Sequence, residues 1–257
     1  MENRTARSII DDGRKFTMTL DEIEVTFFVP CLNEELNIIG AIETILSAVR
    51  IAGCSYEIIV VDDHSSDRSA DLVEQYCCRH PELPLRLIRN DQRKGLSRNY
   101  TDCAFIGSGK YFKFFGGSNM EFVEDVVAVL EKRGEADMIL PYLEIDGREP
   151  RRRMLSILYT KIVNALTGYS LRYYNGSVLH KRYNVMRWHA DTYGYAYQAE
   201  IVTRLLNEGM SYEEVPTKVQ HRTVVKTKAF SFQNMLSVVH SLAQIFFRSL
   251  RRKLYKV

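Results

Sequence analysis

The sequence predicts an α/β protein with a mostly parallel central sheet flanked by helices, and two observations carry that prediction. Short apolar runs typical of buried strands alternate with longer segments of helical periodicity through the first half of the chain. Two of these runs, 24–29 and 58–61, stop abruptly at polar and acidic residues. Parallel strands of this kind deliver polar side chains to the carboxyl edge of a sheet, where open α/β folds bind ligands.

Length and composition agree with this fold class. The chain has 257 residues, of which 46% are hydrophobic and 26% charged, as in ordinary globular domains. A net charge of +3 is too small to indicate nucleic acid as a partner. The five cysteines lack metal-ligand spacing, and we interpret them as reduced thiols. We find no signal peptide and no apolar run that could cross a bilayer, and therefore expect a cytoplasmic protein.

The first half is predicted to contain strands at 24–29, 58–61, 85–88, 111–115 and 136–141. Helices are expected after the first strand, from Ser69 onward, and over 97–106. The first helix has apolar residues at helical spacing, which we expect to face the core: Leu36, Ile39, Ile42, Leu46 and Val49.

The second half is predicted to begin with an amphipathic helix over 154–166 that Gly168 ends. A short strand at 177–180, a helix from 195 and an edge strand at 212–216 follow, the last at an edge because Pro216 cannot donate to a ladder. The tail is helical by pattern, with one apolar face: Leu236, Val239, Ala243, Phe246 and Leu250. We divide the chain into an extension (1–21), an α/β domain (22–230) and an amphipathic basic helix (231–257).

Acidic and amide residues follow the first two strands. Asn33 and Glu34 come just after the first strand, and Asp62 and Asp63 come directly after the second. Adjacent parallel strands would bring these side chains to one crevice. For Asp62 an alternative is open, in which it caps the helix that begins near Ser69.

Three motifs in this order resemble the inverting glycosyltransferases of family 2, which have the GT-A fold. They are Pro30-Cys31-Leu32-Asn33-Glu34, Val61-Asp62-Asp63-His64-Ser65-Ser66-Asp67 and Arg93-Lys94-Gly95-Leu96-Ser97-Arg98-Asn99. The resemblance covers roughly 25–228. The second half is most similar to dolichol-phosphate mannosyltransferases and their bacterial polyprenyl-phosphate relatives.

The resemblance implies a binding site for a nucleotide-diphospho-sugar donor. It assigns Pro30, Asn33, Glu34 and either Asp62 or Asp63 to the base and ribose. A carboxylate suits this task because it accepts hydrogen bonds from a base N–H or a ribose hydroxyl. It assigns the diphosphate to Arg93, Lys94 and Arg98, although Arg93 is equally interpreted as a solvated turn residue. Gly117 and Ser118, in the loop after the fourth strand, are further candidates to bind the donor.

The metal motif of the family, Asp-x-Asp after the fourth strand, is missing. Gly116 and Ser118 stand where the two aspartates belong. Ser118, Asn119 and Glu121 are the remaining candidates to hold Mg²⁺ or Mn²⁺, and we expect weak binding because only Glu121 is anionic. Three interpretations stay open: a metal held mainly by the nucleotide, neutralisation of the diphosphate by Arg and Lys, or loss of catalysis.

On the acceptor side, Gln198 replaces the aspartate with which many family members deprotonate an acceptor hydroxyl. This resembles polyprenyl-phosphate sugar transferases, whose phosphate acceptor is already ionised and needs no base. There, residues matching Arg222 and Lys228 would hold phosphate groups. Asp191 is the candidate base if the acceptor is a hydroxyl, with loop capping as its alternative. His180 is expected to be structural.

The resemblance therefore implies transfer of a sugar, with inversion, to a membrane-associated polyprenyl phosphate, glycolipid or envelope polysaccharide. The alternatives are transfer to a saccharide hydroxyl and a non-catalytic sugar-nucleotide-binding protein. Basic residues in the tail predict a peripheral position on the anionic inner face of the membrane: Arg248, Arg251, Arg252 and Lys253. Packing of the tail on the core or on a second subunit of an oligomer is the competing interpretation.

Overall fold

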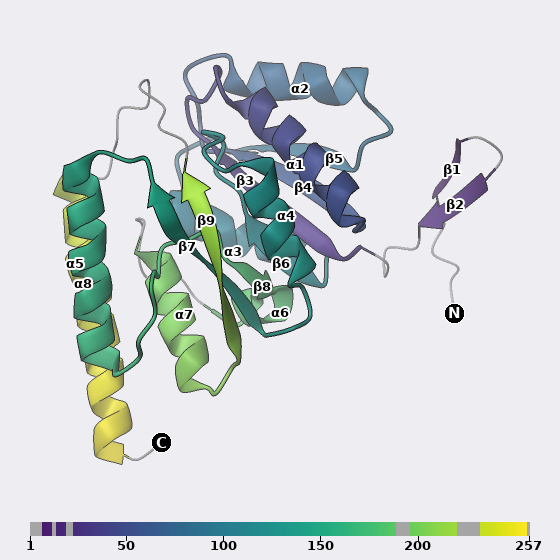
Figure 1. Ribbon diagram of the computed structural model, residues 1–257. Helices are drawn as coiled ribbons and strands as arrows, with labels where there is room; N and C mark the ends of the chain where they lie inside the picture. Colours follow the sequence, from purple (N-terminus) through teal and green to yellow (C-terminus); the bar gives the residue numbers. More distant parts are fainter. Residues whose placement is uncertain (1–6, 12–13, 19–22, 189–195, 220–231, 256–257) are drawn as a thin grey trace.

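The structure is a computed structural model that describes residues 7–11, 14–18, 23–188, 196–219 and 232–255. Its main body is one seven-stranded sheet with helices on both faces (Figure 1). The strand order is β5-β4-β3-β6-β8-β7-β9. The predicted α/β class is confirmed.

Four neighbouring parallel strands form one half of the sheet, and their carboxyl ends meet at one edge. They are β5 (Leu85–Arg89), β4 (Tyr56–Asp62), β3 (Val25–Cys31) and β6 (Tyr111–Phe114). The other half is mixed, because β8 runs antiparallel to both β6 and β7 while β9 runs parallel to β7. These strands are β8 (Leu179–Lys181), β7 (Met138–Asp146) and β9 (Tyr212–Val219). β9 lies at the edge, as Pro216 predicts.

Each face of the sheet buries its own hydrophobic core. One face is covered by α1 (Ile38–Ala52), α2 (Ser69–Arg79) and α4 (Val123–Glu131). The other is covered by α3 (Leu96–Ile106), α5 (Pro150–Thr167), α6 (Arg182–Met186), α7 (Tyr197–Asn207) and α8 (Phe232–Tyr255). The sequence analysis did not predict α4 and α6. None of the described helices is long and apolar enough to cross a membrane.

The predicted core-facing stripe of α1 is partly wrong. The backbone N–H groups of Asn37 and Ile38 both bond to the carbonyl of Glu34, so a turn precedes the helix and α1 begins only at Ile38. Leu36 lies in this turn and is 77% exposed. The residues that α1 buries are Ile38, Ala41, Ile42, Ile45, Ala48 and Val49, while Ile39 and Leu46 are half-buried.

The tail helix α8 packs against α5 and α7 through a narrow face that contains Ser241, Ile245 and Ser249. The hydroxyl of Ser249 donates to the carbonyl of Leu166 at 2.7 Å. Val238 and Leu242 are half-buried against the same core, so the interpretation that the tail packs on the core of its own chain is confirmed for this face. The predicted apolar stripe points elsewhere and is exposed. It includes Leu236 (54% exposed), Val239 (60%), Phe246 (44%) and Leu250 (39%).

The N-terminal extension contains regular structure that its sequence did not predict. The strands β1 (Arg7–Asp11) and β2 (Arg14–Met18) pair antiparallel as a separate two-stranded sheet.

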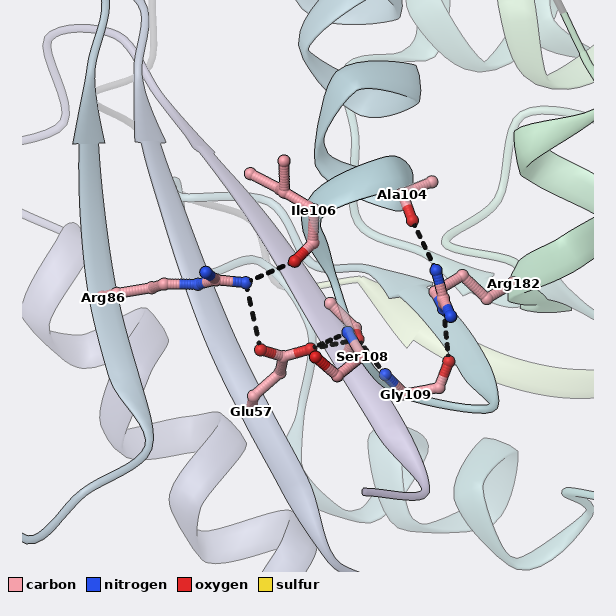
Figure 2. A network of polar contacts seen from close by, with 8 residues as sticks. Glu57, Arg86, Ala104, Ile106, Ser108, Gly109 and Arg182 are labelled. Carbon is pink, nitrogen blue, oxygen red and sulfur yellow. Dashed lines mark hydrogen bonds and ion pairs between the residues drawn. The ribbon is translucent and has the colours of Figure 1, made fainter. Parts of the chain in front are cut away.

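The amino end of the parallel strands is held by a buried carboxylate, that of Glu57 at the start of β4. It accepts hydrogen bonds from the hydroxyl of Thr26 (2.7 Å), from the backbone N–H of Ser108 and from Arg86 Nη2 (3.2 Å). Figure 2 shows how Arg86 also reaches the carbonyl of Ile106. Nearby, the Arg182 guanidinium donates to the carbonyls of Ala104 and Gly109. These contacts fix the connection from α3 to β6.

Candidate functional site

The carboxyl ends of β3 and β4 form the centre of the site. Cys31 lies opposite Asp62 in the parallel register, so the loops that follow the two strands lie side by side. Asn33 joins these loops: its side-chain oxygen accepts from the N–H of Ser66 at 2.8 Å, and its own N–H donates to Ser65 Oγ at 3.0 Å. The predicted convergence of the two strand ends is confirmed.

One carboxylate oxygen of Asp62 has no partner among the described residues. The side chain is only 4% exposed, and Oδ2 accepts from the N–H of Ser65 at 3.2 Å. Oδ1 is buried without a hydrogen bond to any described residue. Arg68 occupies the N-cap position of α2, and the N–H of Ser69 donates to Asp67 Oδ1 at 2.9 Å, so the alternative interpretation of Asp62 as the helix cap is wrong. A buried carboxylate oxygen without a hydrogen bond costs free energy. A ligand that donates a hydrogen bond to Oδ1 would offset this cost.

Asp62 lines an open cleft of about 490 Å³, a size that ligand sites commonly have. The cleft lies between the end of β4, the end of β5 and the start of α2. Its other lining residues are His64, Ser65, Ser66, Asp67, Ala70, Asp71, Arg89, Asn90 and Asp91.

Asp63 binds the backbone of the neighbouring loop that precedes α3. Its carboxylate accepts from the N–H of Lys94 (2.8 Å), the N–H of Gly95 (3.0 Å) and Asn90 Nδ2 (3.1 Å). Burial acts to raise the pKa of Asp63, but these hydrogen bonds together outweigh burial and hold the pKa below its ordinary value. Asp63 therefore anchors the turn that precedes α3, while Asp62 is left to face the cleft.

The anchored turn presents the predicted diphosphate residues. Arg93 and Arg98 are exposed, and neither forms an ion pair with any residue that the structure describes. Lys94 Nζ lies 3.8 Å from a carboxylate oxygen of Asp102. The assignment of the diphosphate to Arg93, Lys94 and Arg98 stays a prediction.

The loop after β6 packs against the end of β3. A Cβ atom on Gly117 would lie 2.5 Å from the carbonyl oxygen of Pro30, so only glycine fits there. Ser118 is half-buried. Asn119 has a left-handed backbone with φ of 51°, and its buried side chain accepts from Thr44 Oγ1 on α1 at 3.0 Å.

The predicted metal set of Ser118, Asn119 and Glu121 does not fit a divalent cation. Asn119 is bonded to α1, and both carboxylate oxygens of Glu121 are engaged: Oε2 lies 3.3 Å from Lys113 Nζ and Oε1 accepts from Ser177 Oγ at 2.7 Å. Within the described ranges, no three His, Cys, Asp or Glu residues are placed to hold a metal ion. Only the neutral hydroxyl of Ser118 remains, which a hard cation does not select.

Gln198, predicted at the acceptor, lies in the core. It is 3% exposed, and its side-chain oxygen is 3.3 Å from Nε2 of the fully buried His180. Burial lowers the pKa of His180 to about 4, so this histidine is neutral at physiological pH, as its predicted structural role requires. A catalytic role for Gln198 stays a prediction. Asp191, Arg222 and Lys228 lie outside the described residues.

Lys113, Ser177 and Asn90 hold the site loops, and the sequence analysis missed all three. Strand alternation carried a signal for Lys113, because it shares a face of β6 with Tyr111 and Phe115, which are both buried. No comparable signal marks Ser177 or Asn90, because their partners are distant in the sequence.

A family model described as "Glycosyl transferase family 2" matches residues 26–230. A dolichyl-phosphate beta-glucosyltransferase of Dictyostelium discoideum is 27% identical over 124 residues, which are 44% of this chain and 38% of that protein. An undecaprenyl-phosphate 4-deoxy-4-formamido-L-arabinose transferase of Pectobacterium carotovorum is 37% identical over 91 residues, 35% of this chain and 26% of that protein. The matched segments thus span well under half the length of these relatives.

Solved structures show the same fold. A mannosyltransferase of Pyrobaculum calidifontis, in complex with GDP-Man and Mn²⁺, superposes with a TM-score of 0.64 at 18% identity. The match covers 90% of this chain and 69% of that one. With the family model matched over most of its length, this chain belongs to glycosyltransferase family 2 and has the GT-A fold.

Proposed function

We propose that the protein transfers a sugar from a nucleotide-diphospho-sugar to a lipid phosphate, with inversion at the anomeric carbon. The observation that carries the proposal is Oδ1 of Asp62, which has no hydrogen-bond partner among the described residues and belongs to a side chain that lines the cleft beyond the adjacent parallel strands β4 and β5. A nucleobase N–H would satisfy this oxygen with a charge-assisted hydrogen bond. The exposed Arg93 and Arg98 would meet the charge of the diphosphate.

A phosphate acceptor is supported by the residues and by the relatives. The two similar proteins are named for transfer to dolichyl phosphate and undecaprenyl phosphate. A phosphate oxygen is already anionic near neutral pH, so it attacks the anomeric carbon without a base. The bond from that carbon to the diphosphate oxygen breaks, and the nucleoside diphosphate leaves with its electron pair. Gln198, where many family members have a base, is compatible with this reaction.

We infer that the protein lies on an anionic membrane surface at the inner, cytoplasmic face. The apolar face of α8 is exposed and continues beyond the predicted stripe through Phe247 (61%) and Leu254 (69%). Helix α5, packed beside α8, is also apolar on its exposed side, with Met154 (69%) and Leu158 (53%). Exposed arginines flank both helices, among them Arg151, Arg153 and Arg251. Such a combination is typical of interfacial helices.

The function is tested by turnover of radiolabelled sugar nucleotides with polyprenyl phosphate as acceptor. A thermal-shift screen of UDP, GDP, dTDP and CDP sugars first selects the donor. We expect label in the organic-extractable lipid fraction, and much less with Asp62→Asn. Transfer to soluble saccharides only would favour the saccharide-hydroxyl alternative. Donor binding without transfer to either acceptor would favour the non-catalytic alternative.

The membrane position is tested by co-sedimentation with vesicles that contain anionic lipid. We expect Val239→Asp with Phe247→Asp to abolish pelleting, because both changes place charge on the apolar face of α8. Ile51→Asp, at a residue of α1 that is 65% exposed, is the matched control and should pellet like the native chain. Equal pelleting of all three proteins would refute the inference. A native dimer that the α8 variant dissociates, without vesicle binding, would indicate a second subunit on this face.

A further inference from the structure

The loop 115–122, which follows β6, contains a single carboxylate, that of Glu121. In the solved mannosyltransferase with this fold, the donor is bound together with Mn²⁺. A divalent cation held between protein and diphosphate needs oxygen ligands, and carboxylates are the protein's usual contribution. Whether Glu121 is available therefore decides whether this loop, among the described residues, can contribute a carboxylate to a metal ion.

A lysine ammonium already occupies the environment of this carboxylate. Lys113 has no exposed side-chain surface, and its Nζ has three oxygen neighbours: Glu121 Oε2 at 3.3 Å, the carbonyl of Ser177 at 2.9 Å and the carbonyl of Phe114 at 3.4 Å. An ammonium has three N–H donors, so its capacity is filled. The second carboxylate oxygen takes the hydroxyl of Ser177 at 2.7 Å. The charge of Glu121 is thus neutralised from within the protein.

The same contacts give the loop its shape. They tie its carboxyl end to β6 and to the segment before β8, while Asn119 ties its middle to Thr44 on α1 and Gly117 packs on Pro30. An ion that recruited Glu121 would have to break a buried ion pair and leave the Lys113 ammonium without a counter-charge, which is strongly unfavourable.

We propose that this protein binds its nucleotide-diphospho-sugar without a divalent cation, and that Lys113 is a positioning residue that commits Glu121 to the loop. The inference rests on the proposed function. It assigns compensation of the diphosphate charge to protein cations, of which Arg93 and Arg98 are exposed and without an ion pair to any described residue.

Calorimetric titration of UDP, GDP, dTDP and CDP tests this, each with EDTA and with Mn²⁺ and corrected for binding of the ion to the nucleotide. We expect the nucleotide Kd of the native protein to differ by less than about twofold between the two conditions. An added interaction worth about 1.4 kcal/mol would change the Kd tenfold. Glu121→Gln should show the same indifference to Mn²⁺, whatever its own affinity.

The matched gain-of-metal variant combines Gly116→Asp with Ser118→Asp. A Cβ on Gly116 would meet Ser118 Oγ at 3.6 Å, an ordinary contact, so this position accepts a side chain. We expect Mn²⁺ to tighten nucleotide binding by about tenfold or more in this variant alone.

Two results would overturn the inference while leaving the proposed function intact. One is a decrease of about tenfold or more in the nucleotide Kd of the native protein when Mn²⁺ is added. The other is a folded acid-pair variant that binds nucleotide with no response to Mn²⁺, which would mean that the loop does not face the diphosphate. If no nucleotide binds in any condition, the proposed function itself fails and this inference fails with it.

Discussion

Strand β4 begins and ends with a buried acid, and the two acids have opposite hydrogen-bonding states. Glu57 at the amino end is 8% exposed and bonded to Thr26, Arg86 and Ser108 (Figure 2). Asp62 at the carboxyl end is 4% exposed, yet one of its oxygens has no described partner. A satisfied buried acid contributes to stability, whereas an unsatisfied one is a cost that ligand binding can offset. The difference separates the structural end of the sheet from the binding end.

Removing the satisfied acid should have the largest effect on folding. Glu57→Ala leaves the Thr26 hydroxyl and the Ser108 N–H without their acceptor, and each loss costs about 1–3 kcal/mol. We expect the free energy of unfolding in urea to fall by about 2–5 kcal/mol. Nucleotide affinity of the folded fraction should stay unchanged. If Glu57→Ala instead caused a large loss of nucleotide affinity and left the free energy of unfolding unchanged, the amino end of β4 would be the binding end, contrary to our proposal.

A second structural group, His180, should make stability depend on pH. Its pKa is about 4 in the folded protein and near 6.5 when unfolded, so between these values the unfolded chain binds more protons. Stability from this residue is complete above pH 6.5 and is lost as pH falls towards 4, by about 3 kcal/mol in all.

This dependence is measured by urea unfolding at a series of pH values. His180→Gln should flatten the curve between pH 6.5 and 4 relative to that of the native chain. Identical slopes for the native chain and the variant would show that another group causes the pH dependence.

Removing the charge of the unsatisfied acid should affect binding and spare folding. Asp62→Asn replaces a charged acceptor by a neutral one, and we expect nucleotide affinity to fall by about 1.5–3 kcal/mol, the value of a hydrogen bond to a charged group. The free energy of unfolding should change by less than about 1 kcal/mol. Calorimetry and urea unfolding on the same preparation measure both, with Glu57→Gln as the opposite-end control.

The smallest effect is expected at Asp63, which shares features of both ends. Asp63→Asn weakens the hydrogen bonds to the N–H groups of Lys94 and Gly95, so the turn that carries Arg93 loosens. We expect losses of about 1 kcal/mol in both stability and nucleotide affinity. Loss of affinity as large as in Asp62→Asn, with stability unchanged, would indicate that Asp63 itself contacts the nucleotide.

The sequence predicted the parallel half of the sheet well, because its two central strands, β3 and β4, are mainly apolar runs that end at turns. It could not tell which aspartate faces the cleft, since Asp62 and Asp63 are adjacent and only the positions of Ser65 and Lys94 decide their partners. The partner of Lys113 could not be predicted for the same reason, because Glu121 becomes its neighbour only when the loop folds back.

The tail shows a different limit of sequence patterns. The periodicity of the sequence identified the apolar stripe of α8, but it did not show which face of the helix packs against the rest of the protein. The face that packs against the body combines Ile245 and the half-buried Val238 and Leu242 with the small residues Ser241 and Ser249. The predicted apolar stripe is left exposed.

The central claim is tested most directly by a crystal structure of the protein with the nucleoside diphosphate that binds most tightly. We predict the base in the cleft beyond β4 and β5, with one of its N–H groups within hydrogen-bonding distance of Asp62 Oδ1 and the diphosphate beside Arg93 and Arg98. A nucleotide bound elsewhere, with Asp62 Oδ1 still unpartnered, would contradict the account.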